Sequence, residues 1–134
     1  MRVLVLDEDD AVREALRLLL EDAGHCVLEA TDTFTALAVL RSRAHFCVAL
    51  FDVPPCAGRR DAEFFTCVAA DPALATRHAY ICMTTSVARL DLALRRQLAA
   101  YCVPVLAKPF DVDMLLRTLA QTAASLPCPH ALAR

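Results

Sequence analysis

The chain has 134 residues, of which 57% are hydrophobic and 22% are charged, and its formal net charge is −2. This length allows one domain with a substantial core, and the composition excludes a disordered or highly solvated chain. The small net charge and the lack of a basic stripe argue against nucleic acid as a direct partner, and no apolar run approaches the roughly 20 residues that span a bilayer.

Short apolar runs alternate with helical patterns along the chain. The first run, Val3–Leu6, is continuous and branched, which is typical of a strand buried on both faces, and Asp9 and Asp10 follow it as helix N-caps. Apolar residues then recur at helical spacing up to the stop signal Gly24, namely Val12, Ala15, Leu16, Leu19 and Ala23.

The middle of the chain continues this alternation. We predict a weaker second strand at Cys26–Leu28 and a helix over residues 33–44 that buries Leu37 and Leu40. The third strand, Phe46–Phe51, delivers Asp52 at its carboxyl end. After a proline-bearing loop comes a short helix that ends near Asp71-Pro72, marked by Phe64, Phe65 and Val68.

Two further strand and helix pairs complete the pattern. The fourth strand is Tyr80–Met83, which ends at Thr84-Thr85, and the helix after it is marked by Leu90, Leu94 and Leu98. The fifth strand is Val103–Ala107 and ends at Lys108. Asp111 caps the last helix, which we expect to bury Val112, Leu115, Leu116, Leu119 and Ala123 and to end at Pro127 and Pro129.

Polar residues stand at the carboxyl ends of four of these strands. Alternating strands and helices predict an α/β fold, with a parallel sheet that carries helices on both faces. Ligands of such sheets bind outside the carboxyl ends of the strands. We therefore expect convergence, at one edge of the sheet, of Asp7, Glu8, Asp52, Thr84 and Lys108.

These residue types together point to phosphoryl transfer. Crowded carboxylates repel one another unless a cation compensates, and oxygen ligands suit Mg²⁺. Lys108 and Thr84 could hold phosphoryl oxygens while an aspartate acts as nucleophile. Each residue alone also has an ordinary explanation as a helix cap, loop acid, strand end or solvated turn, so the prediction rests on their joint placement.

Seven cysteines raise the question of disulfides or a zinc site. No two stand in a C-x-x-C arrangement and their number is odd, which favours reduced cysteines in a reducing cytoplasm. We expect packing as small hydrophobes for those in or beside apolar runs, which are Cys26, Cys47, Cys82 and Cys102.

The ordered motifs resemble those of receiver domains, the CheY-like modules of two-component response regulators. The matching segments are Val3–Glu8, Leu50–Asp52, Ile81–Thr84 and Lys108–Phe110. The resemblance covers about residues 1–125 and leaves 126–134 as a short tail. It implies a single-domain, doubly wound (βα)5 flavodoxin-like sandwich with a parallel five-stranded sheet in the order 2-1-3-4-5.

The resemblance also implies the roles of the site residues. Asp52 would accept a phosphoryl group from a histidine kinase or a phosphotransfer protein. Mg²⁺ would be held by Asp7, Glu8, Asp52 and the backbone carbonyl of Pro54. Thr84 and Lys108 would contact the phosphoryl oxygens, and the Lys108–Pro109 peptide bond would be cis.

The implied output is a change of surface rather than a catalysed reaction. The fourth helix, fifth strand and fifth helix would bind a downstream protein, with Val105 at the switch position that an aromatic residue usually occupies. The chain would be a non-enzymatic cytoplasmic phosphoprotein, monomeric or weakly dimeric, with no nucleic-acid or membrane partner.

Departures from the family pattern keep a second hypothesis open. Glu8 replaces the usual aspartate, Val105 replaces the aromatic, and Thr85 could take the place of Thr84 if the strand shifts by one residue. The loop after Asp52 is about two residues short, since Pro54, Pro55 and Gly58 come early. A degenerate receiver that binds a partner without phosphorylation would fit these departures.

A third hypothesis is enzymatic. Val3–Asp9 also resembles the first motif of haloacid-dehalogenase-type phosphatases, in which the first aspartate, here Asp7, is the nucleophile. That family needs a later acidic pair after another strand, whereas Asp111 and Asp113 open a helix here. Phosphorylation of Asp7 rather than Asp52 would identify this class.

Overall fold

The computed structural model describes residues 1–42, 47–53 and 59–124, and it describes residues 59–63 through their backbone alone. The elements in chain order are β1 (Arg2–Leu6), α1 (Asp10–Asp22), β2 (Cys26–Ala30), α2 (Thr33–Ser42), β3 (Cys47–Asp52), α3 (Arg59–Ala70), α4 (Pro72–Arg77), β4 (Ala79–Thr84), the 3-10 turn η1 (Val87–Arg89), α5 (Leu92–Ala100), β5 (Val105–Ala107) and α6 (Val112–Ala124). The predicted tail, residues 126–134 with Pro127 and Pro129, lies outside the described residues.

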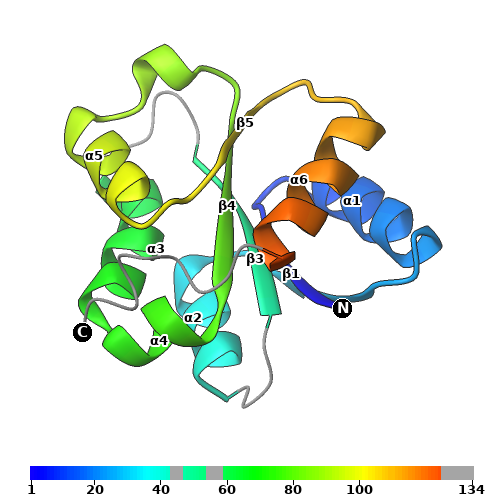
Figure 1. The fold of residues 1–134 in the computed structure, drawn as a ribbon, viewed down its shortest axis with the longest axis horizontal. Helices are drawn as coiled ribbons and strands as arrows, with labels where there is room; N and C mark the ends of the chain where they lie inside the picture. The colour runs from blue at the N-terminus through cyan, green and yellow to red at the C-terminus, as the bar shows by residue number, and fades with distance from the viewer. Residues whose placement is uncertain (43–46, 54–58, 125–134) are drawn as a thin grey trace.

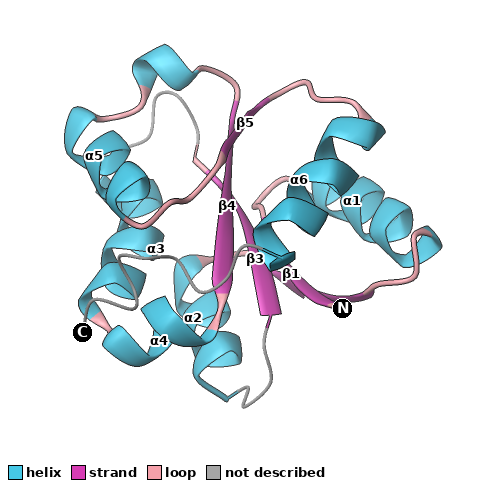
Figure 2. Ribbon diagram, in the orientation of Figure 1, coloured by secondary structure: helices cyan, strands magenta, loops and turns pink. Residues whose placement is uncertain are grey.

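The strands form one parallel sheet in the order β2-β1-β3-β4-β5, which confirms the predicted fold and strand order (Figures 1 and 2). The register brings the strand ends level, because Leu6 pairs with both Ala30 and Phe51, and Asp52 pairs with Met83. Residues that leave neighbouring strands therefore emerge at the same edge of the sheet.

Helices cover both faces of this sheet (Figure 1). Side chains of β3 alternate between the two faces, as the geometry of a strand requires. Val48 and Leu50 join a cluster with α1 and α6, whereas Cys47, Ala49 and Phe51 join a larger cluster with α2, α3 and α5. All five are at most 1% exposed, which explains why the third strand is an unbroken apolar run in the sequence.

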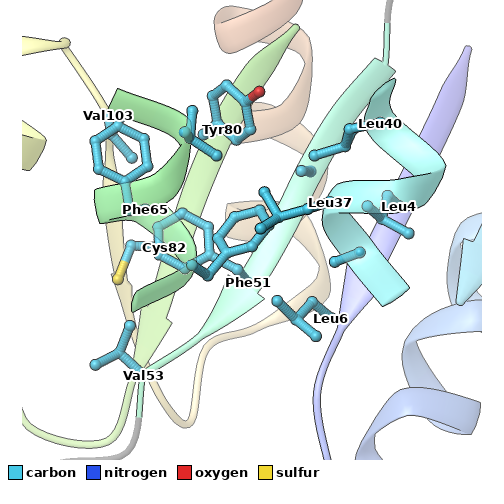
Figure 3. Close-up of a cluster of buried hydrophobic side chains, with 14 of the residues drawn as sticks. Leu4, Leu6, Leu37, Leu40, Phe51, Val53, Phe65, Tyr80, Cys82 and Val103 are labelled. Carbon is cyan, nitrogen blue, oxygen red and sulfur yellow. The ribbon is translucent and has the colours of Figure 1, made fainter. Parts of the chain in front are cut away.

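The larger cluster is rich in aromatic rings (Figure 3). Phe51 at the end of β3 packs on Phe64 and Phe65 of α3, with ring centroids 5.0 and 5.8 Å apart. Phe65 also meets Tyr80 of β4 edge-on at 5.7 Å. Because Phe51 directly precedes Asp52, this packing anchors the strand end that carries the predicted acceptor.

The structure contains one short helix that the sequence analysis did not predict. The predicted stop near Asp71-Pro72 ends α3, but α4 begins there at once. Asp71 is its N-cap and accepts hydrogen bonds from the N–H groups of Ala73 and Leu74, with Pro72 in the first turn. The predicted fourth and fifth helices are therefore α5 and α6.

Several details of the predicted elements differ from the structure. Leu90 is buried but precedes α5, because it has an extended backbone and Asp91 caps the helix. Strand β5 begins at Val105 rather than Val103, and the intervening Pro104 has no N–H to donate to a ladder. Val112 opens α6 but is 47% exposed, since the first turn of the helix stands at the rim of the domain.

The four cysteines that were predicted to pack as hydrophobes divide into two groups, and Cys67 is half-buried. Cys47 and Cys82 are buried in the core as predicted. The prediction was wrong for Cys26 and Cys102, which are exposed at the start of β2 and after α5. An apolar sequence neighbourhood does not bury a residue that lies where the chain turns back at the surface. None of the helices among the described residues is long and apolar enough to cross a bilayer.

Candidate functional site

Three of the predicted site residues meet at the carboxyl edge of the sheet. The Lys108 ammonium donates to Oδ1 of Asp52 at 2.7 Å and to Oδ2 of Asp7 at 3.0 Å. Asp7 follows β1, Asp52 ends β3 and Lys108 follows β5. The level strand ends bring together residues that are up to 101 positions apart in the sequence.

Backbone hydrogen bonds continue from the sheet into this site. The N–H of Asp7 donates to Ala30 at 3.3 Å, that of Val53 to Met83 at 2.8 Å, and that of Lys108 to Thr84 at 2.7 Å. The Lys108–Pro109 peptide bond is cis, in agreement with the prediction. The three charged side chains thus start from backbone that the sheet fixes.

Asp7 and Asp52 differ in their access to solvent. The side chain of Asp7 is 2% exposed, and its Oδ1 accepts a hydrogen bond from the N–H of Asp9 at 2.9 Å. Both of its carboxylate oxygens are therefore engaged by the protein. The side chain of Asp52 is 14% exposed, so it is the more accessible carboxylate of the pair.

The charges in the site leave a surplus of negative charge. Burial raises the pKa of Asp52, Lys108 opposes this rise through its hydrogen bond and charge, and the charges of Asp7 and Glu8 add to it. Burial lowers the pKa of Lys108, but the hydrogen bonds to Asp52 and Asp7 outweigh it and raise that pKa overall. One ammonium faces two carboxylates, which is an arrangement that favours a further cation.

Glu8 does not join these residues. It is exposed in the bend that follows β1, whereas its neighbour Asp7 is buried. In the part of the chain that the structure describes, no three His, Cys, Asp or Glu side chains stand close enough to hold a metal. The predicted ligand Pro54 and the shortened loop at 53–58 fall largely outside the described residues.

Asp7 and Asp52 nevertheless suit a magnesium ion chemically. Mg²⁺ binds hard oxygen donors and is usually held by one or two carboxylates together with water and substrate phosphate. The two carboxylates and their surplus negative charge meet this requirement. Such an ion would displace the Lys108 ammonium from the carboxylate oxygens or share these oxygens with it.

Among the hydrogen bonds of the described residues, none joins the side chains of Thr84, Thr85 or Val105 to the Lys108 ammonium, whose partners are Asp7 and Asp52. Thr84 is fully buried at the end of β4, and its hydroxyl interacts with Ser86, whose N–H donates to it at 3.3 Å. Thr84 pairs with Ala107, which makes it the last strand residue, and Thr85 is exposed beyond it. Val105 is half-buried at the start of β5, opposite Cys82.

Sequence reasoning missed Arg13. Its guanidinium donates to the backbone carbonyl of Asp7 at 2.7 Å, although the side chain comes from the first turns of α1. The sequence offered one signal, which is a lone cation within a helical turn of the run Asp7–Asp10.

Comparisons with known proteins give a clear result for structure and none for sequence. No family model matches the chain, and no curated protein is significantly similar to it. Among solved structures, the chemotaxis protein CheY4 of Vibrio cholerae superposes with a TM-score of 0.73 at 26% identity, over 90% of this chain and 97% of that one. A CheY-like receiver domain from Methanospirillum hungatei JF-1 matches with a TM-score of 0.71 at 23% identity, over 92% and 94%. A two-component response regulator from Clostridium difficile matches with a TM-score of 0.73 at 15% identity, over 96% and 99%.

Proposed function

Because the chain has the fold of the CheY-like response regulator receiver domains, as its motifs indicated, we propose that it is a phosphorylatable receiver and that Asp52 is the phosphoryl acceptor. The donor would be a phosphohistidine of a histidine kinase or phosphotransfer protein in the cytoplasm. One observation carries this proposal: Lys108 lies between Asp7 and Asp52 at the carboxyl edge of a receiver fold.

The geometry favours Asp52 over Asp7 as the nucleophile. Asp7 is enclosed, and both of its carboxylate oxygens already accept hydrogen bonds from the protein. Asp52 is more exposed, and only its Oδ1 accepts the bond from Lys108 among the contacts of the described residues. A second oxygen of Asp52 is therefore available to attack an incoming phosphorus atom.

The proposed step conserves atoms and charge. A carboxylate oxygen of Asp52 attacks the phosphorus, the bond from phosphorus to the donor nitrogen breaks, and the departing imidazole takes up a proton from solvent. The product is an acyl phosphate on Asp52. Lys108 can then hold a phosphoryl oxygen in place of the carboxylate oxygen that it holds in the unmodified protein.

A bound Mg²⁺ would neutralise the charge that the phosphoryl group brings into the site. Asp7 and Asp52 are the residues of this chain that would hold it. Asp7 would also keep Lys108 directed toward Asp52, since it accepts the second hydrogen bond of that ammonium.

The output surface would be α5, β5 and α6. Thr84 is the last residue of β4, and Lys108 directly follows β5 beneath this surface. A phosphoryl group that contacts both residues could therefore alter the output surface. Large apolar side chains on α5 and α6 are exposed and could meet a partner, namely Leu92, Val112 and Met114. Val105 lacks an aromatic ring, so we expect the coupling between Thr84 and this surface to be weak.

Glu8 supports a second candidate function. A receiver that holds magnesium poorly would bind its partner without phosphorylation, and with Glu8 exposed, Asp7 and Asp52 are the two carboxylates that the described residues bring to the site. This candidate predicts no metal-dependent labelling under any condition. A phosphatase that uses Asp7 is disfavoured by the enclosure of that side chain.

Intact-protein mass spectrometry tests these candidates. We expect the full chain, incubated with acetyl phosphate and millimolar Mg²⁺, to gain the mass of a single phosphoryl group. The gain should vanish with a chelator and in Asp52→Asn, and Asp113→Asn on the exposed face of α6 is the matched control that keeps it. Labelling that survives in Asp52→Asn but is lost in Asp7→Asn would instead identify the phosphatase, and no labelling at all would favour the degenerate receiver.

A further inference from the structure

Arg13 connects three segments around the acidic site. Its Nη1 donates to the carbonyl oxygen of Asp7 at 2.7 Å, its Nη2 to Asp10 at 2.6 Å and its Nε to Glu29 at 3.2 Å. These acceptors belong to the end of β1, the start of α1 and the edge strand β2. The planar guanidinium has donors that point in fixed directions, so one side chain can hold all three acceptors at once.

The bond to the Asp7 carbonyl differs from the two ion pairs. The Arg13 side chain is 13% exposed, whereas that of Asp10 is 87% exposed and that of Glu29 is 37% exposed. Exposed ion pairs contribute little because water competes for both partners. The carbonyl of Asp7 lies in a part-buried position, where a hydrogen bond to a charged donor is stronger.

The hydrogen bond from Arg13 restrains the backbone of the chain directly after Asp7. A trans peptide unit is planar, so holding the carbonyl of Asp7 also fixes the orientation of the amide of Glu8. With the N–H of Asp7 held by Ala30 and its carboxylate by Asp9 and Lys108, each polar group of Asp7 then has a partner. Arg13 supplies the one contact of the set that comes from a side chain on a helix.

We propose that Arg13 is a positioning residue, which holds the peptide after Asp7 so that the Asp7 carboxylate faces Lys108 and Asp52 in the arrangement that binds a divalent cation. In its metal-binding part this inference rests on the proposed function. Arg13 touches neither Asp52 nor Lys108 in the described contacts, so its effect passes through Asp7. Glu29 restrains the guanidinium from the other side and extends the connection to β2.

Arg17 provides a matched control on the same helix. It also pairs with Glu29, at 3.4 Å, and its other ion pairs are with Glu14 and Glu21. Loss of Arg17 therefore removes a cation and a Glu29 contact from α1 but leaves the carbonyl of Asp7 held. Arg13→Lys is the conservative variant, since it keeps the positive charge but loses the planar guanidinium that can donate to several acceptors at once.

The experiment compares full-length wild type, Arg13→Ala, Arg13→Lys and Arg17→Ala by two measurements. Calorimetric titration with Mg²⁺ should give an affinity lowered roughly tenfold in both Arg13 variants and unchanged in Arg17→Ala, as is usual when the support of a metal ligand is lost. Carbon NMR of the metal-free proteins should show the carboxyl signals of Asp7 and Asp52 shifted in the Arg13 variants alone.

Specific outcomes would overturn the proposal. If Arg13→Lys keeps the wild-type affinity and carboxyl signals, Arg13 contributes charge and not position. If Arg13→Ala and Arg17→Ala lose the same thermal stability and neither shifts the carboxyl signals, Arg13 is an ordinary surface ion pair. If wild type binds no Mg²⁺, the metal step of the proposed function fails, while the metal-free carboxyl signals still decide the role of Arg13.

Discussion

Two polar centres lie at opposite ends of β3 and β4; one is partly exposed and charged, and the other is buried and neutral. At the carboxyl ends, Lys108 faces Asp7 and Asp52, so charge is left over. At the amino ends, His78 is 1% exposed, accepts the N–H of Cys47 on Nδ1 at 3.1 Å, and with Nε2 contacts the carbonyl of Leu40 at 3.0 Å.

The hydrogen bonds of His78 define its state. Nδ1 accepts from a backbone N–H, so the proton of the neutral ring belongs on Nε2, which donates to Leu40. Both ring nitrogens of His78 have a backbone partner, and the neutral ring carries no charge. The difference between the centres suggests a general distinction: a centre that supports the fold is neutral and satisfied, whereas a centre that binds a ligand keeps charge that folding alone does not need.

The largest effect on stability should come from the satisfied centre. His78→Ala removes the ring nitrogens that contact the N–H of Cys47 and the carbonyl of Leu40, and it leaves a cavity at a buried position. We expect a loss of about 3–4 kcal/mol in the free energy of unfolding. Urea denaturation measures it, and His78→Gln should lose less because an amide can both accept and donate. A loss below about 1 kcal/mol for His78→Ala would mean that this centre does not support the fold.

A smaller loss of stability should follow from removing the Lys108 ammonium, which is the cation of the charged centre. Lys108→Met leaves Asp7 and Asp52 facing one another without compensation, which we expect to lower the free energy of unfolding by about 2 kcal/mol, less than for a fully buried pair because the site is partly exposed. The loss should shrink in Lys108→Met/Asp52→Asn, which removes one of the two carboxylates. Equal losses in the single and double variants would show that repulsion is not the cause.

The satisfied centre should also give the domain an acid-sensitive component. Burial lowers the pKa of His78 below its ordinary value near 6.5, with a smaller contribution from Arg77. The unfolded chain therefore takes up this proton first, so stability is lost as the pH falls below about 6.5, at most about 1.4 kcal/mol per pH unit, until the folded state is protonated as well. His78→Gln should lack this component in denaturation curves measured between pH 7 and pH 5. A slope that is unchanged in His78→Gln would assign the effect to other groups.

The same comparison shows what the sequence could and could not predict. Asp7, Asp52 and Lys108 follow apolar runs, and the parallel register brings such residues to one edge, so their meeting followed from strand order alone. Arg13 and His78 act through contacts with backbone atoms of residues on other elements, and no local pattern encodes those contacts. The resemblance implied a metal role for Glu8 as the second acid of the pair, but a sequence motif does not specify exposure, and Glu8 is exposed in the bend after β1.

The smallest expected change in the free energy of unfolding is a gain rather than a loss, and it comes from removing the charge of Asp52. This opposite sign distinguishes the charged centre from the centre at His78. Burial raises the pKa of Asp52, so for this acid the folded state binds the proton more tightly than the unfolded state does. Its contribution to stability is then favourable at low pH and is lost as the pH rises through the raised pKa, which makes ionised Asp52 unfavourable for folding at pH 7.

The Asp52→Asn variant tests this prediction, because it keeps the shape of the side chain and an oxygen for Lys108 but removes the surplus charge. We therefore expect this variant to be more stable than wild type by about 1 kcal/mol without metal, which is the order of one like-charge interaction that solvent partly screens. Urea denaturation with a chelator measures the gain, and Asp113→Asn should show none because that carboxylate is exposed. Millimolar Mg²⁺ should stabilise wild type but not Asp52→Asn, and so narrow or reverse the difference in the free energy of unfolding, because the proposed magnesium site would need both carboxylates. An Asp52→Asn variant that is less stable than wild type without metal would mean that Asp52, like His78, is held mainly for the fold.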